Sequence, residues 1–223
     1  MKKGITFLIT IILIFSLLVI GISKINKQSQ SEEKIKVIAT LFPQYDFAKQ
    51  IGGDKVDVSL LLTPGTETHT YEPTPQDIIN VNKADLYIYT GKYMEPWSDK
   101  IANSITSNTQ VLDASKNINL INEEQFEKEH DTIDNNEEES DNSHHHEYDP
   151  HIWLNPQNAI GMVKNIEEEL CNIDPQNKEY YQKNAENYIN QLKSLDTEIE
   201  TTIKESPKNK IAFGGTFAYA YFI

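Results

Sequence analysis

The chain has 223 residues, enough for one large domain or two small ones, and a formal net charge of −14 from 34 acidic and 20 basic residues. Residues 123–149 hold twelve Asp and Glu against one Lys, which is −11 of the −14, so the remaining chain is close to neutral. The absence of a basic stripe argues against nucleic acid as a partner, and a single cysteine, Cys171, excludes an intramolecular disulfide.

The first 34 residues are predicted to form a membrane anchor and a linker. Lys2 and Lys3 precede an uncharged apolar run over residues 4–23, which as a helix rising about 1.5 Å per residue nearly crosses a hydrocarbon core of about 30 Å. The run is longer than most signal-peptide cores, although the small residues at 21–23 also suit cleavage. We therefore expect an exported protein on the extracytoplasmic face of the cell membrane, tethered by an uncleaved N-terminal helix.

Strand-like and helix-like segments alternate over the following residues. Strands are predicted at residues 36–40, 56–62, 86–90 and about 110–112, and helices at 43–51, after 74 and at 97–105. Thr74-Pro75-Gln76-Asp77 is a typical helix start, with Thr as N-cap and Pro at the first helical position. This alternation predicts an α/β fold, namely an N-terminal lobe with a four-stranded, mainly parallel sheet and flanking helices.

Two further helix starts follow, at Asn155-Pro156 and at Asp174-Pro175. The second opens an amphipathic pattern of about 25 residues, or roughly 40 Å of helix, without internal Gly or Pro. Its apolar positions are spaced by fours and threes: Tyr181, Ala185, Tyr188, Leu192, Leu195, Ile199 and Ile203. A helix of this length is expected to act as a strut between two parts of the protein, and residues 210–213 beyond it are predicted to form a strand.

The histidines point to a metal site. His69 lies in PGTETHTYEP at residues 64–73, a loop expected at the carboxyl end of the second strand, where parallel sheets bind ligands. His151 lies in DPHIWLNP at residues 149–156. Either histidine alone could be an ordinary solvated or hydrogen-bonded side chain, but together they are candidate Zn(II) ligands. Nearby carboxylates could fix their imidazole tautomers: Glu67, Glu72 and Asp149.

The acidic segment 122–149 holds the other histidines: His130, His144, His145 and His146. Blocks of like charge are usually solvated and without regular structure. Histidines among carboxylates in such a loop can also capture zinc weakly and raise its concentration near a main site. We interpret the segment as an auxiliary metal-collecting loop. Three consecutive histidines also occur in expression tags, but those are usually longer and terminal.

Four blocks of sequence resemble the zinc- and manganese-type substrate-binding proteins of bacterial ABC importers. They are PGTETHTYEPTPQDI, ADLYIYTGKYMEPW, DPHIWLNPQNA and DPQNKEYYQKNAENYINQL, in this order, and the resemblance covers residues 34–223. It implies two α/β lobes bridged by one long helix, a metal between the lobes, ligands at His69 and His151, and a membrane permease as partner. The histidine-rich loop is similar to that of zinc-importing members, which favours Zn(II) over Mn(II) as the transported ion.

The sequence departs from the family pattern at two points. The third ligand is usually a histidine two residues before an Ala-Phe or Ala-Tyr pair, and the matching position before Ala218-Tyr219 is Thr216, whose hydroxyl is a poor zinc ligand. The fourth ligand would come from a later part of the second lobe. We therefore expect a truncated receptor that binds zinc weakly, because half of the usual four ligands are missing. Its parts are a metal-binding lobe (35–172), a bridging helix (173–206) and the start of a C-terminal lobe (207–223).

These features predict a monomeric protein that captures Zn(II) and passes it to a permease without catalysing a reaction. Trp97, Tyr219 and Tyr221 are expected to be packing residues. One alternative is a surface adhesin or interaction protein whose metal is structural or incidental. Another is a zinc hydrolase, since two histidines and a bound water would be compatible with one, although the sequence offers no Ser-His-Asp, P-loop or HExxH motif.

Overall fold

The computed structural model describes residues 33–130, 147–207 and 218–222. The chain divides into two units, Met1–Glu33 and Lys34–Ile223, and every element below belongs to the second unit. The predicted membrane helix at residues 4–23 lies outside the described residues. Within the ranges just given, the structure contains no helix that is both long enough and apolar enough to cross a bilayer.

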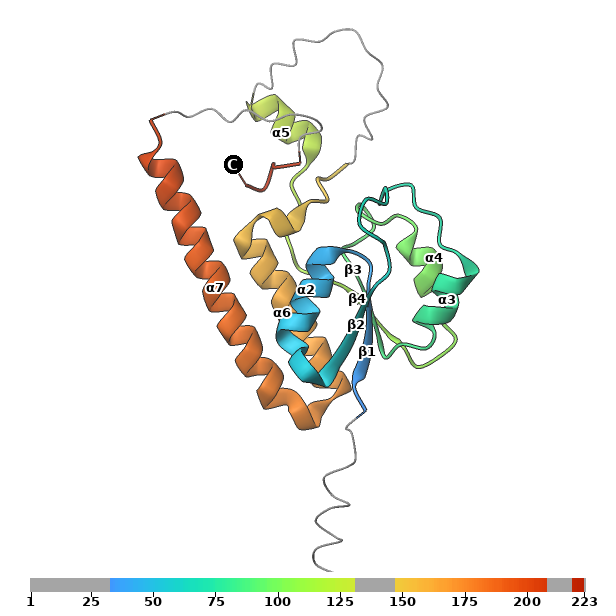
Figure 1. Ribbon diagram of the computed structural model, residues 1–223. Coiled ribbons are helices and arrows are strands. Elements are labelled where there is room, and N and C mark those ends of the chain that lie inside the picture. Colours follow the sequence, from blue (N-terminus) through green and yellow to red (C-terminus); the bar gives the residue numbers. More distant parts are fainter. Residues whose placement is uncertain (1–32, 131–146, 208–217, 223) are drawn as a thin grey trace, which may run out of the picture. The chain divides into compact units, whose positions relative to one another are not determined.

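Four strands form one parallel sheet (Figure 1): β1 (Ile35–Ala39), β2 (Val56–Leu60), β3 (Leu86–Tyr89) and β4 (Gln110–Asp113). The strand order is β2-β1-β3-β4, so the predicted parallel sheet is confirmed. The direction of winding reverses between β1 and β3. Open α/β sheets bind ligands outside the carboxyl ends of the strands at such a switch point.

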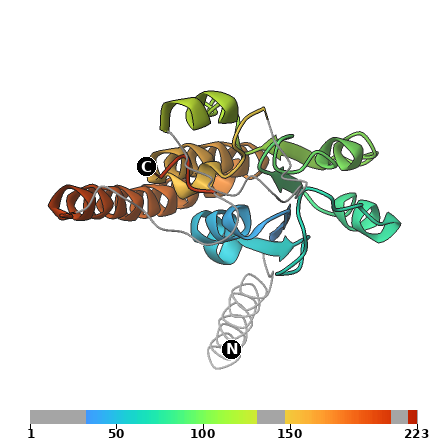
Figure 2. The same ribbon diagram turned by 90° about the horizontal axis from the view of Figure 1, so that it is seen from above.

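Helices cover both faces of this sheet (Figures 1 and 2). Helices α2 (Phe42–Gly52) and α6 (Pro156–Ile173) lie on one face, and α7 (Lys178–Glu205) packs against both of them. The short helices α3 (Pro75–Val81) and α4 (Ser98–Ala102) lie on the other face. Three single-turn 3-10 helices complete the connections: Gly53–Lys55, Ile152–Leu154 and Pro175–Asn177.

The sheet separates two hydrophobic cores of unequal size. Along β3, Leu86 and Ile88 point into the larger core with α2, α6 and α7, whereas Tyr87 points into the smaller one, because successive side chains of a strand face opposite sides. The smaller core also holds Trp97 and Ile101 beneath α3 and α4. Trp97 is 7% exposed, which confirms its predicted packing role.

The predicted helix starts at residues 74 and 155 are confirmed by their capping hydrogen bonds. The Thr74 hydroxyl accepts from the Asp77 amide at 3.2 Å, and the Asp77 carboxylate accepts from the Thr74 amide at 2.7 Å, which makes a capping box. The Asn155 side chain accepts from the amides of Gln157 and Asn158 at 2.8 and 3.2 Å. Each cap satisfies amides that have no partner within the first helical turn.

The helices differ from the sequence-based expectation in several places. The start predicted at Asp174-Pro175 opens only the 3-10 turn Pro175–Asn177, and α7 begins at Lys178. Helix α4 ends at Ala102 rather than 105, and the Ser104 hydroxyl donates to the Ile101 carbonyl at 2.7 Å, a local bond that competes with the helical pattern. Within the acidic segment, Glu123–His130 forms an unpredicted helix, α5. Glu123 and Glu124 lie in its first turn, where negative charge is favourable.

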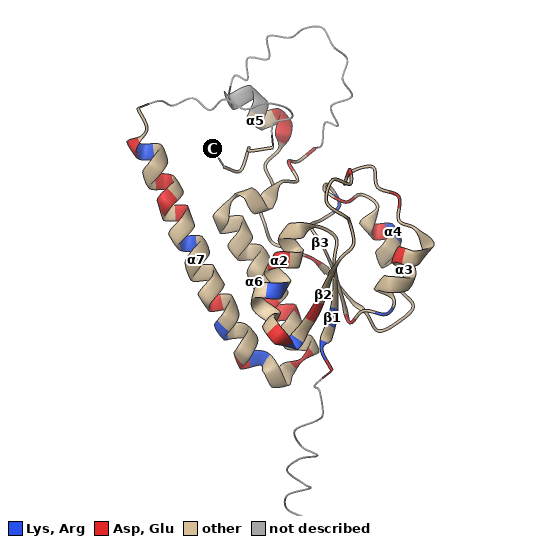
Figure 3. Ribbon diagram, viewed as in Figure 1, with Lys and Arg blue, Asp and Glu red and all other residues tan. Residues whose placement is uncertain are grey.

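The long helix α7 is buried only over its first half. Tyr181, Ala185 and Ile189 pack into the larger core, and the Tyr188 hydroxyl donates to Asp46 at 3.0 Å. Further along, large apolar side chains of the predicted stripe are exposed: Leu195 at 46% and Ile203 at 51%. Acidic and basic side chains are interspersed along the helix (Figure 3). The strut predicted from the sequence is therefore present as a helix whose distal half carries exposed apolar residues.

Tyr221 packs against the segment that leads to His151. Its side chain is 6% exposed, and its hydroxyl accepts from the Ile121 amide at 3.0 Å and donates to the Asp149 carbonyl at 2.8 Å. The Asn155 side chain donates to the Tyr221 carbonyl at 2.8 Å. These bonds fix the segment on both sides of His151, and the packing role expected for Tyr221 is confirmed. The same prediction is wrong for Tyr219, whose side chain is 43% exposed.

Glu95 is a fully buried carboxyl at the switch point of the sheet. It accepts from the Thr40 hydroxyl at 2.5 Å and from the Thr90 amide at 3.0 and 3.2 Å. Thr40 and Thr90 directly follow β1 and β3, so one side chain joins the two central strands. Burial raises the pKa of Glu95 to about 8, although the bonds from Thr40 and Thr90 act to lower it.

Two substitutions on α7 should separate its buried half from its exposed half. Replacing the buried Ile189 by Ala should lower the free energy of unfolding by about 2–5 kcal/mol, because it leaves a cavity in the larger core. The matched change Leu195→Ala on the exposed face should cost less than about 0.5 kcal/mol. Urea denaturation of both variants measures the difference, and equal losses would contradict the packing described.

The raised pKa of Glu95 predicts a pH-dependent stability. The folded chain keeps a proton up to about pH 8 that the unfolded chain releases near its ordinary value of 4.5. The contribution of this group is therefore fully present below the unfolded pKa and is lost as pH rises toward 8, on the order of a few kcal/mol in total. Urea denaturation across this range should show the decline in the parent chain and a flatter profile for Glu95→Gln. The exposed control Glu72→Gln should keep the parent profile; a Glu95→Gln profile as steep as the parent would refute the assignment.

Candidate metal centre

His69 lies in a long loop, residues 61–74, between β2 and α3. The indole Nε1 of Trp97 donates to the carbonyl of Thr68 at 2.6 Å, directly before His69. Two residues after His69, the Tyr71 ring lies edge-on to Trp97 with centroids 5.0 Å apart, and its hydroxyl donates to Asp77 at 2.8 Å. The loop is thus bound on both sides of His69, and the imidazole itself is half-buried.

The second histidine is held by a carboxylate. Asp149, 4% exposed, accepts through one oxygen from both the backbone amide and the Nδ1 of His151, each at 2.8 Å. The Asp149 amide donates in turn to the Ile121 carbonyl at 2.9 Å. Ile152, the next residue, is buried in the larger core, so His151 is attached directly to that core.

The contact between Asp149 and His151 determines which ring nitrogen faces outward. A carboxylate is only an acceptor when ionised, so Nδ1 of His151 carries the proton and Nε2 presents its lone pair. This is the arrangement that metal-binding histidines usually adopt, because the outer carboxylate fixes the tautomer and raises the basicity of the ring. The predicted role of Asp149 in holding a histidine tautomer thus has a direct structural counterpart.

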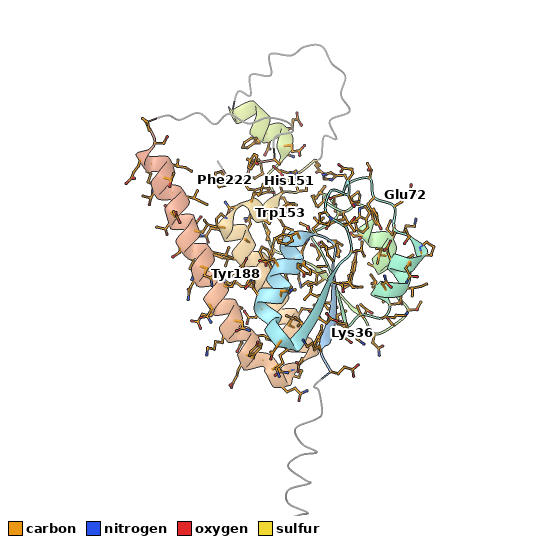
Figure 4. The ribbon with its side chains drawn as sticks, in the orientation of Figure 1. Lys36, Glu72, His151, Trp153, Tyr188 and Phe222 are labelled. Atoms are coloured by element: carbon orange, nitrogen blue, oxygen red, sulfur yellow. The ribbon has the colours of Figure 1, made fainter. Side chains whose placement is uncertain are left out.

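The two imidazoles converge although they are 82 positions apart in the chain. Their ring centroids are 6.3 Å apart and their planes are inclined by 77°. Figure 4 shows His151 at the end of the molecule opposite to Lys36, which lies at the start of β1, so the histidines meet at the carboxyl ends of the strands. Both histidines therefore lie at the edge of the sheet where parallel sheets bind ligands.

The separation is compatible with one ion between the rings. Zn–N bonds are about 2.0–2.1 Å long. Two imidazoles on one ion therefore have ring centres about 6.4 Å apart when the N–Zn–N angle is linear, and about 5 Å apart when it is tetrahedral. The observed 6.3 Å lies inside the upper limit. Tetrahedral coordination would require the rings to approach by about 1 Å, a change within reach of side-chain rotation.

Other expected contributors are placed differently or lie outside the described residues. Glu67 accepts from the backbone amide of His69 at 3.0 Å rather than orienting its ring, and Glu72 is exposed, well away from His151 in Figure 4. Several predicted residues are not described, either wholly or in their side chains: Thr216, His130, His144, His145 and His146. Over the described part of the chain, no group of three or more His, Cys, Asp or Glu side chains could hold a metal.

The two ends of the acidic segment are joined close to His151. Asn122 and Tyr148 form an antiparallel bridge, and the Tyr93 ring lies 5.2 Å from the Tyr148 ring. The Tyr93 hydroxyl also donates to Glu147 at 3.3 Å. The stem of the histidine-bearing segment is therefore fixed three to four residues before His151.

Sequence reasoning did not find the support of His69. Trp97 was expected to pack, which it does, but its N–H bond to the Thr68 carbonyl connects two segments 29 positions apart. Such a bond has no local sequence signal. The only hint was that a buried tryptophan normally finds an acceptor for its N–H group.

Known proteins resemble this chain in sequence and in fold. A family model described as zinc-uptake complex component A, periplasmic (ZnuA), matches residues 37–223. A high-affinity zinc uptake system protein, ZnuA of Bacillus subtilis (strain 168), is 45% identical over 179 residues, 80% of this chain and 54% of the relative. This chain therefore spans about half the length of that relative.

Solved structures with the same fold include two metal-related proteins. The metal-dependent lipoprotein YcdH from Bacillus subtilis shares 37% identity with a TM-score of 0.71, over 85% of this chain and 63% of that one. Zn(II)-bound AdcA from Streptococcus pneumoniae shares 31% identity with a TM-score of 0.65, over 78% of this chain and 34% of that one. With the family model matching most of its length, this chain belongs to the family of the periplasmic component A of zinc-uptake complexes.

Proposed function

We propose that this chain captures Zn(II) outside the cytoplasm and delivers it to the membrane permease of an ABC importer, with His69 and His151 as two of the metal ligands. The observation that carries the proposal is the 6.3 Å separation of two imidazoles from distant segments. The family supports the choice of ion, because its model describes zinc uptake. Imidazole ligands also favour Zn(II) over the harder Mn(II).

The role proposed is binding, not catalysis. Asp149, the carboxylate in contact with the His151 ring, is engaged through both the ring and the backbone of that histidine, so it is suited to orient a ligand rather than to abstract a proton. A hydrolase would need a general base within hydrogen-bond reach of a metal-bound water. A structure of the zinc-loaded chain with such a base beside an open metal position would favour the hydrolase instead.

The remaining parts are assigned by the same proposal. Residues 35–172 form the metal-binding lobe, residues 173–206 the bridging helix, and residues 207–223 the start of a second lobe, with Thr216 at the position of the third ligand that the resemblance implies. The acidic segment collects zinc through His130 and the histidines at 144–146, helped by the fixed stem beside His151. The N-terminal apolar segment tethers a monomer to the membrane.

Zinc-independent adhesion of the purified chain to cells would favour the alternative function of a surface adhesin.

The first test removes both proposed ligands. Zinc titration by calorimetry should give a measurable affinity for the parent chain. The double variant His69→Ala/His151→Ala should lose more affinity than the about 10–100-fold that is lost when a residue hydrogen-bonded to a metal ligand is removed. Each single variant should fall between the two. Because the acidic segment can also bind zinc, the titration is repeated in a chain with the histidines at 144–146 replaced by Ser. Unchanged tight binding by the double variant in that background would disprove the site.

The second test removes the charge that orients His151. Asp149→Asn keeps the shape of the side chain but no longer stabilises the protonated Nδ1, so zinc affinity should fall about 10–100-fold. Glu147→Gln, an exposed acidic neighbour in the same segment, should bind zinc like the parent chain. Equal losses in both variants would show that general negative charge, not the contact with the imidazole, supports binding.

A further inference from the structure

The loop that carries His69 runs for fourteen residues between β2 and α3 without a helix or strand, and β2 is an edge strand of the sheet. Loops of this length inside a compact domain are held by specific contacts when they carry function. One such contact is local, because the Glu67 carboxylate accepts from the His69 amide at 3.0 Å. Others connect the loop to the smaller core through the neighbours Thr68 and Tyr71.

Trp97 binds both of these neighbours. Its Nε1 donates to the Thr68 carbonyl at 2.6 Å, and its ring lies edge-on to Tyr71 at 5.0 Å. The indole is 7% exposed and packs with Tyr87 and Ile101 in the smaller core, so it has little freedom to follow the loop. A rigid donor of this kind restrains the backbone directly before His69.

The position of Trp97 is fixed in turn by Glu95. The Glu95 carboxyl joins Thr40 and Thr90 at the carboxyl ends of the two central strands. The Glu95 amide donates to the Gly91 carbonyl at 2.9 Å, and the Glu95 carbonyl accepts from the Ser98 amide at 2.9 Å. Glu95 and Trp97 are separated only by Pro96, which removes one backbone rotation. The turn of residues 95–97 thus connects the switch point of the sheet to the His69 loop.

We propose that Trp97, anchored through Glu95, is a positioning residue that holds His69 at metal-binding distance from His151. The inference rests on the proposed zinc site and goes beyond it, because neither Glu95 nor Trp97 touches the ion. The brace formed by residues 95–97 fixes the loop backbone beside His69 before the metal arrives, and so limits how far its ring can lie from that of His151. Preorganisation of this kind raises affinity by reducing the ordering that binding would otherwise require.

The decisive variant removes the indole N–H and keeps an aromatic ring. Trp97→Phe should weaken zinc binding about 10–100-fold, the range found when a residue that orients a metal ligand is lost. It should also shift the visible absorption bands of the Co(II)-loaded chain, because these report the geometry around the ion. Affinity is measured by competition with a chromophoric chelator in the chain whose histidines at 144–146 are replaced by Ser.

A matched control separates positioning from packing. Ile101→Val truncates a fully buried neighbour in the same small core without touching Thr68. It should lower the melting temperature while leaving zinc affinity and the Co(II) spectrum at parent values. If Trp97→Phe is too unstable to purify, replacing Trp97 by 3-benzothienylalanine keeps the bicyclic shape, lacks the N–H donor, and should reproduce the loss of affinity.

The possible outcomes distinguish this inference from the function on which it rests. Parent-like zinc affinity and Co(II) spectrum in the Trp97 variants, with His69→Ala still impaired, would overturn the positioning role and leave the zinc site intact. An affinity loss in Ile101→Val equal to that in Trp97→Phe would also overturn it, since packing alone would then account for the effect. Zinc binding unaffected by His69→Ala would overturn the proposed function and the positioning role together.

Discussion

The buried contact between Asp149 and His151 is the constraint on which the candidate site depends. One carboxylate oxygen accepts both the backbone amide and the Nδ1 of the same histidine, so the ring and its peptide are fixed together. The backbone of Asp149 is in turn bonded to Ile121 and Tyr221, which places the turn against the larger core. With Nδ1 occupied, the only nitrogen that His151 can offer to an ion is Nε2.

The two histidines are supported by different cores. His151 precedes Ile152, which enters the larger core shared by α2, α6 and α7, whereas His69 is held through Trp97 and Tyr71 on the side of the smaller core. The sheet separates these cores, and the imidazoles meet only beyond its carboxyl edge. An ion bound by both rings would therefore join two parts of the molecule that the hydrophobic packing leaves separate, and its binding energy would add to the stability of the folded chain.

The parts of this arrangement that follow local rules could be predicted from the sequence. The alternation of strands and helices predicted the parallel sheet, and the caps at Thr74 and Asn155 predicted the helix starts.

Other features could not be predicted in this way. Helix α5 was missed because a block of acidic residues resembles a solvated loop until the favourable charge in its first turn is considered. Glu67 was expected at a ring and binds the amide of His69 instead, since a side chain two residues away more easily reaches the backbone. The Trp97 contact joins distant segments, so no local pattern encodes it.

The asymmetric support of the two rings also determines which of them can adjust to an ion. At 6.3 Å the rings are about 1 Å farther apart than tetrahedral coordination requires. His151 cannot rotate without losing the bond from its Nδ1 to the buried Asp149, although its backbone amide still donates to that oxygen. Because the Nδ1 bond selects Nε2 as the nitrogen offered to the ion, a rotated His151 would lose the orientation that the site requires. On the other side of the site, the bond from Trp97 to the Thr68 carbonyl holds the loop backbone rather than an imidazole, so an approach of about 1 Å is compatible with that bond. We therefore expect the approach of the two rings to come mainly from the His69 side.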